Sequence, residues 1–170
     1  MRNSKHGSLS RNLLLGAVGG LAASWVMTQF QSAMSAIAKP ANQKSQPSGD
    51  DATVKTADAI SHQVAHQPLR PKDKGWAGPL VHYAFGTLVG ALYGGLAKAL
   101  PATRAGHGTA YGTAVWLAAD EVAVPALGLS GSPGKNPPST HVKALASHLV
   151  YGLTTDLTMR ALNRVAARAR

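Results

Sequence analysis

Apolar and polar segments alternate along this chain in blocks much longer than a helical turn. Four segments are predominantly apolar and hold few charged residues: 13–34, 77–99, 107–127 and 142–162. A helix needs about 20 such residues to cross a bilayer. The connections after the second and third segments are short, which favours antiparallel neighbours. The pattern therefore predicts an all-α, polytopic membrane protein, with residues 1–170 forming a single domain built as an antiparallel four-helix transmembrane bundle.

The connection between the first two segments, residues 39–75, is long and polar. Apolar residues repeat at helical spacing in its second half: Val54, Ala57, Ile60 and Val64. Because Asp50 and Asp51 are of a residue type that caps a following helix, we predict a short amphipathic helix over 52–66 that rests on the membrane surface or on the bundle. His62 and His66 are four residues apart and could hold a metal, but no third ligand lies near them, so we predict no metal here.

The first apolar segment has a second interpretation, as a cleaved signal peptide. Basic residues precede it, and Ala36-Ile37-Ala38 resembles a small-residue cleavage site. The distance from Leu13 to Ala38 is long for the apolar part of a signal peptide, and polar residues interrupt it. We therefore expect this segment to remain as the first membrane span.

Small residues recur at every fourth position within the apolar segments, and such stripes let membrane helices approach closely. We predict eight packing glycines: Gly16, Gly20, Gly86, Gly90, Gly94, Gly108, Gly112 and Gly152. The same glycine faces could also hold the helices of a second copy or of another membrane protein.

Five ionisable residues fall inside the predicted spans: His82, Asp120, Glu121, His148 and Asp156. Each would cost roughly 2.5 kcal/mol or more in hydrocarbon, so such residues usually face the interior of a bundle. We expect them to lie within reach of one another, and Asp156 also to pair with Arg160 one turn later. Three interpretations remain: a structural hydrogen-bonding network, a proton or ion path, and a metal site made of the two histidines and one carboxylate.

The composition argues against several classes of protein. The chain has no cysteine, which excludes disulfides and thiolate metal sites. Its net charge of +10 suggests nucleic acid at first, but the basic residues flank apolar segments, as membrane anchors do. No nucleophile elbow, phosphate loop or dinucleotide fingerprint is present. We therefore predict no enzyme activity, no cofactor and no nucleic-acid partner.

Three ordered motifs carry a family resemblance: VHYAFGTLVGALYGGLAKALP, GHGTAYGTAVWLAADEVAVPALGLSGSP and ASHLVYGLTTDLTMRAL. Together, over about residues 76–165, they resemble the YagU-like family of small bacterial inner-membrane proteins. That resemblance implies a multi-pass protein of the bacterial inner (plasma) membrane. The family has no assigned biochemical activity, so the resemblance supplies no catalytic residue.

The two sides of the predicted bundle carry almost equal numbers of lysine and arginine residues, but aspartates dilute those of the long connection. By the positive-inside rule we expect both termini in the cytoplasm. The lipid bilayer is then the first partner of this chain. We expect a structural or packing component of the membrane, with a proton, ion or small-solute pathway as the alternative and a membrane metalloenzyme as the second alternative.

Overall fold

The computed structural model describes residues 3–38 and 50–169, and every regular element in these residues is helical. In chain order the elements are α1 (Asn3–Ala38), α2 (Ala52–Ala65), η1 (Pro71–Asp73), α3 (Lys74–Ala99), η2 (Pro101–Gly108), α4 (Thr109–Trp116), η3 (Leu117–Ala123), α5 (Val124–Ala126), η4 (Pro133–Lys135) and α6 (Pro138–Arg168). The prediction of an all-α protein is confirmed. The part of the long connection over 39–49 lies outside the described residues.

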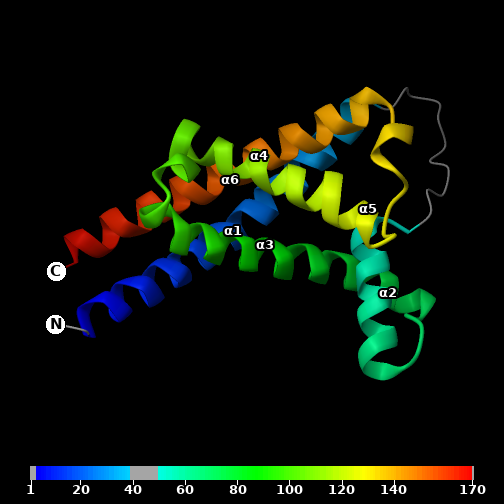
Figure 1. Cartoon of the computed structure of the whole chain (residues 1–170), viewed down its shortest axis with the longest axis horizontal. Coiled ribbons are helices and arrows are strands. Elements are labelled where there is room, and N and C mark those ends of the chain that lie inside the picture. Colours follow the sequence, from blue (N-terminus) through cyan, green and yellow to red (C-terminus); the bar gives the residue numbers. More distant parts are fainter. Residues whose placement is uncertain (1–2, 39–49, 170) are drawn as a thin grey trace.

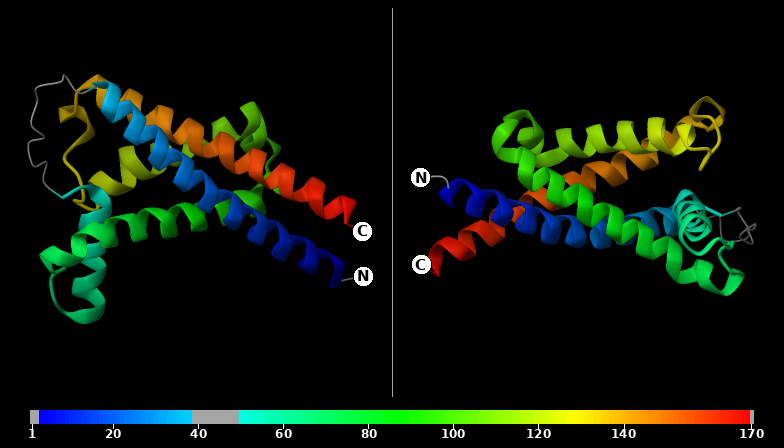
Figure 2. Two further views of the ribbon diagram at one scale, coloured as in Figure 1. Left: turned by 180° about the vertical axis from the view of Figure 1, so that it is seen from behind. Right: turned by 60° about the horizontal axis from the view of Figure 1, so that its bottom comes forward.

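Four long rods make up the fold: α1, α3, the continuous run of α4, η3 and α5, and α6 (Figure 1). Helix α1 packs against α3 and α6, and α4 packs against α6. Both ends of the chain lie at the same end of the molecule (Figures 1 and 2). Two stretches, Leu9–Ile37 and Pro71–Ala99, are long and apolar enough to cross a membrane.

The predicted short helix of the long connection is present as α2. Asp51 caps it by accepting a hydrogen bond from the backbone N–H of Val54 at 2.9 Å. Partial burial raises the pKa of Asp51, but hydrogen bonds from Thr53 and Val54 outweigh it and leave this pKa below its usual value. The helix ends where His66 adopts the left-handed conformation, with φ 53°. Helix α2 stands across the beginning of α3, where Val54 contacts Gly78 (Figure 1).

The third rod begins and ends differently from the predicted span 107–127. Gly106, His107 and Gly108 all have positive φ, so the chain turns there and the α-helix starts at Thr109. From Leu117 the rod is π-helical, and Val124 N–H bonds to the carbonyl of Ala119, five residues back. The rod ends at Ala126, where Gly128 adopts a positive φ of 71° and closes the helix: its N–H donates to the Pro125 carbonyl, and the Leu129 N–H donates to the Val124 carbonyl.

Two glycine crossings hold the rods together. At the first, between α1 and α3, a Cβ on Gly90 would lie 2.5 Å from the Gly20 Cα, so only glycine permits this approach. At the second, between α4 and α6, a Cβ on Gly112 would lie 2.9 Å from the His148 carbonyl carbon. All eight glycines singled out from the sequence lie against another part of the chain at these two crossings.

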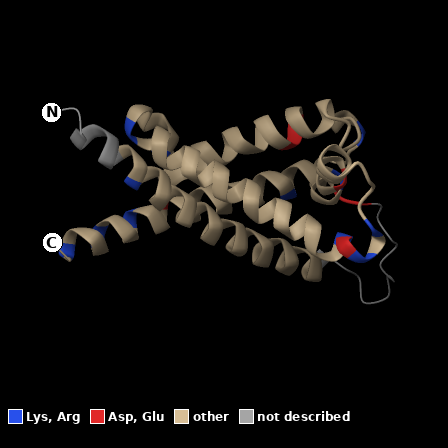
Figure 3. Ribbon diagram, turned by 90° about the horizontal axis from the view of Figure 1, so that it is seen from below, with Lys and Arg blue, Asp and Glu red and all other residues tan. Residues whose placement is uncertain are grey.

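The interior of the molecule holds small, aromatic and polar side chains. The buried cluster contains these residues: Ala23, Met27, Tyr93, Ala97, Tyr111, Tyr151 and Met159. Ser24, Ser147, Thr155 and Asp156 are buried with them. Charged residues gather toward the two ends of the rods, and the long middle is almost free of them (Figure 3).

Candidate functional site: polar groups between the helices

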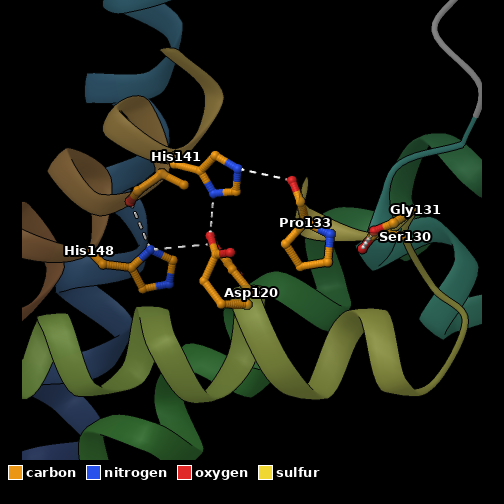
Figure 4. Close-up of polar contacts among 8 residues, drawn as sticks. Asp120, Ser130, Gly131, Pro133, His141 and His148 are labelled. Carbon is orange, nitrogen blue, oxygen red and sulfur yellow. Dashed lines mark hydrogen bonds and ion pairs between the residues drawn. The ribbon is translucent and has the colours of Figure 1, made fainter. Parts of the chain in front are cut away.

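Asp120 and His148 face each other between the third rod and α6. The Asp120 Oδ2 lies 3.7 Å from the His148 Nδ1, which also donates to the Ala144 carbonyl at 2.9 Å. His148 is buried, whereas more than a third of the Asp120 side chain is exposed. Figure 4 shows His141 and His148 both reaching from α6 toward Asp120.

Glu121 pairs with His141, a residue that the sequence patterns did not single out. The two side chains meet at 2.7 Å through Oε1 and Nδ1, and the second ring nitrogen, Nε2, lies 3.1 Å from the Pro133 carbonyl (Figure 4). Only the protonated imidazole can donate to both acceptors. The hydrogen bond to Glu121 is the largest cause of a raised pKa for His141, which sits before the fourth predicted span.

The local backbone explains why two adjacent acids reach one helix. His141 and His148 are seven residues apart, so they lie on the same face of α6. Asp120 and Glu121 lie in η3, whose π-helical turn is wider than an α-turn and brings successive side chains closer together around the axis. The result is two acid–imidazole pairs side by side. The seven-residue spacing between His141 and His148 is the sequence feature that could have identified His141.

Asp156 forms a separate group near the end of the molecule that holds the termini. Its carboxylate is almost fully buried and accepts a hydrogen bond of 2.6 Å from the Tyr93 hydroxyl. Arg160 lies 2.6 Å away through Nε, which is the pair expected from the helical spacing, and Arg104 lies 3.6 Å away. One buried carboxylate therefore contacts two guanidinium groups.

His82 stands apart from both groups. Its Nε2 lies 3.3 Å from the Ser24 carbonyl, and its ring meets Tyr83 edge to face. Between described residues, no hydrogen bond or ion pair joins His82, the two acid–imidazole pairs and the Asp156 group to one another. Of the five residues taken from the sequence, the structure thus brings together Asp120 and His148 and gives the other three separate partners.

The described residues contain no group of three or more His, Asp or Glu side chains placed to hold a metal ion. His62 lies 3.8 Å from Asp58, one turn earlier in α2. The polar groups described above can form hydrogen bonds, pair their charges and exchange protons.

Comparison with known proteins gives one match. The model of a family described as "Protein of unknown function (DUF1440)" matches residues 52–157, from the start of α2 into the second half of α6. No curated protein matches the chain, and no solved structure does.

Proposed function

We propose that this chain, which belongs to the DUF1440 family of proteins of unknown function, is a polytopic membrane protein whose four rods cross the bilayer. The crossing segments would be those expected from the sequence: 13–34, 77–99, 107–127 and 142–162. The resemblance to the YagU-like family supports a bacterial inner membrane, with both termini in the cytoplasm.

One observation carries the membrane location: the molecule exposes its large apolar side chains and buries polar ones. Leu14 is 68% exposed and Leu88 is 70% exposed, whereas Ser24 and Thr155 are 0% and Asp156 is 1% exposed. In water this distribution would forfeit most of the free energy that apolar burial supplies. In a bilayer the exposed leucines contact lipid, and the polar groups find their partners inside.

The third rod and α6 are less apolar overall, but their outer faces fit the same location. The large apolar residues exposed on them include Leu117, Val122, Val142, Leu153 and Leu157. Asp120, Glu121, His148 and Asp156 each pair with a residue of another element. The close packing of α1 on α3 favours a retained first span over a cleaved signal peptide, because cleavage would remove one side of the Gly20–Gly90 crossing.

Within the membrane we propose a structural role without catalysis. Support comes from the pairing of ionisable side chains in three separate groups: Asp120 with His148, Glu121 with His141, and Asp156 with Tyr93 and two arginines. Since the eight packing glycines are occupied inside the chain, a second copy or another membrane protein would contact the exposed apolar residues instead. Purification in mild detergent, followed by identification of co-migrating chains, tests for such a partner.

Cysteine labelling tests the topology, because the chain has no cysteine of its own. We expect Gln67→Cys and Ala169→Cys, both at exposed positions, to react with a membrane-impermeant maleimide from opposite sides of membrane vesicles. Leu88→Cys, at the centre of the second span, should stay unlabelled until detergent is added. Labelling of Gln67→Cys and Ala169→Cys from the same side would refute the four-span arrangement.

A proton path is the second candidate, and the two adjacent acid–imidazole pairs favour it. Chains of Asp, Glu and His side chains relay protons in many transporters. In proteoliposomes, Asp120→Asn and Glu121→Gln should then abolish a pH-driven flux, whereas Asp50→Asn, outside the spans, should leave it unchanged. A wild-type protein that carries no flux would end this candidate and leave the structural role.

A further inference from the structure

A pocket of about 190 Å³ opens between α1, α3, η2 and α6, at the end of the molecule that holds both termini. Its polar lining comes from five residues: Asn12, Lys98, Arg104, Arg160 and Asn163. Gly94 and Ala97 form its apolar part on α3 and place no large side chain in it. The pocket therefore combines long basic side chains with room for a group between them.

The charge of this pocket is unbalanced. Three cationic side chains line it: Lys98, Arg104 and Arg160. The two arginines contact the carboxylate of Asp156, which is buried beside the pocket. Lys98 forms no hydrogen bond or ion pair with any described residue. The excess of about two positive charges lies where side chains remain accessible, because Arg104 is 45% and Arg160 is 32% exposed. An anion is the ligand that such a site attracts.

The free donors of the two arginines point to the kind of anion. Both guanidinium groups approach Asp156 through Nε, and a guanidinium has five N–H donors in total. Neither arginine forms a hydrogen bond with another described residue through its terminal nitrogens, so these nitrogens can donate to a second acceptor. Arginine binds phosphate through two parallel N–H donors, and lysine adds a point charge. Arg11 donates to Asn163 at 3.0 Å and brings a fourth cation to the rim.

The depth of the pocket in the proposed bundle matches that of lipid phosphates. Lys98 ends the second predicted span, Arg104 lies in the turn that follows, and Arg160 stands near the end of the fourth span. Basic pockets between membrane helices on the cytoplasmic side bind anionic headgroups. We propose that this pocket binds a phosphate group, either that of an anionic phospholipid or free phosphate. The lipid source rests on the proposed membrane location, whereas the phosphate chemistry does not.

The test uses the full chain, purified in a neutral detergent. Thermal unfolding and equilibrium binding are measured with inorganic phosphate, with short-chain phosphatidylglycerol and with short-chain phosphatidylcholine. Stabilisation by phosphatidylglycerol alone identifies a lipid headgroup, and stabilisation by inorganic phosphate identifies the free ion. Phosphatidylcholine should bind at least tenfold more weakly than phosphatidylglycerol, because its headgroup carries no net charge. Equal stabilisation by the two lipids, or none by any of the three ligands, would overturn the proposal.

Substitution of Lys98 locates the site. Because Lys98 has no partner in the described fold, Lys98→Gln should keep the unliganded melting temperature and weaken binding about tenfold or more. Lys98→Arg keeps the positive charge and should retain binding. This variant separates the loss of charge in Lys98→Gln from a purely structural effect. The matched control is Lys143→Gln, an exposed lysine in the first turns of α6 at the opposite end. Equal losses in Lys98→Gln and Lys143→Gln would show attraction by overall charge and contradict a pocket. Cysteine labelling tests the membrane location separately, so the two proposals can fail independently.

Discussion

The sharpest prediction concerns the crossing of α1 and α3 at Gly90. Replacing Gly90 by alanine adds one methyl group that points at the backbone of the opposite helix. That Cβ would lie 2.5 Å from the Gly20 Cα and 2.7 Å from the Gly20 nitrogen. Non-bonded carbon atoms prefer a separation of about 3.5–4.0 Å, so the helices must move apart by about 1 Å. Neither contact is the end of a flexible side chain that could rotate away.

The expected loss of stability follows from a comparison of Gly90 with Gly95, another glycine of α3. Alanine favours a helix over glycine by about 1 kcal/mol at either position. At Gly95, a Cβ would meet only the flexible ends of Leu13 and Leu9, at 3.1 Å and 4.0 Å. Overpacking a rigid contact typically costs roughly 1–3 kcal/mol. The helix propensity cancels between the two variants, so Gly90→Ala should be less stable than Gly95→Ala by about 1–3 kcal/mol. Gly90→Leu should lower stability further.

The assay is unfolding of the purified protein in mixed micelles, with increasing SDS and helicity followed by circular dichroism. The free energy of unfolding of Gly95→Ala should equal or exceed that of the wild type. Equal stability of Gly90→Ala and Gly95→Ala would show that α1 and α3 do not approach at Gly20, and the first crossing would then be misplaced.

Two further predictions concern polar contacts. Since Glu121 raises the pKa of His141 above its usual value of about 6.5, their pair stabilises the fold fully below that pH and loses its contribution as the pH rises through the raised pKa. The melting temperature in detergent should therefore fall as the pH rises above about 6.5. Glu121→Gln should make the melting temperature less dependent on pH, and an unchanged dependence in this variant would contradict the Glu121–His141 pair. Tyr93→Phe removes the hydroxyl that donates to Oδ1 of the buried Asp156 carboxylate and should lower stability by about 1.5–3 kcal/mol. Tyr83→Phe is its control, because the Tyr83 hydroxyl has no hydrogen-bond partner among the described residues, and equal effects of the two changes would refute the assignment.

The helices of this protein follow from local sequence signals. Apolar segment length predicted the positions of the rods, and Asp51 predicted the start of α2, because a carboxylate caps a helix by a contact three residues away. The small residues at Gly86, Gly90 and Gly94 lie on one face by helical periodicity alone. Each of these signals depends on neighbours within one or two turns, which the order of residues determines directly.

The partners of the ionisable residues depend on how the rods cross, and the sequence does not contain that information in local form. The π-helical segment reorients Asp120 and Glu121 and aligns them with two histidines of α6. A 3.6-residue periodicity cannot anticipate such a segment. Arg104 lies in an irregular turn with three positive φ values close behind it, so its contact with Asp156 follows from the tertiary fold alone.

Tyrosine hydroxyls form a third kind of contact between the rods. The free energy that these hydrogen bonds contribute shows which contacts dominate. Tyr111 donates to the Val89 carbonyl at 2.7 Å, Tyr151 donates to the Gly86 carbonyl, and Tyr93 donates to Asp156. Hydrogen bonds between membrane helices contribute about 0.6 kcal/mol each on average, so the two to backbone carbonyls contribute about 1.2 kcal/mol together. A single methyl group at Gly90, at about 1–3 kcal/mol, is expected to cost about as much as these two or more. In the proposed membrane bundle, lipid removes the hydrophobic attraction between helices. Close backbone contact at the glycine crossings would then supply most of the adhesion, and the polar groups would pair in the register that these crossings set.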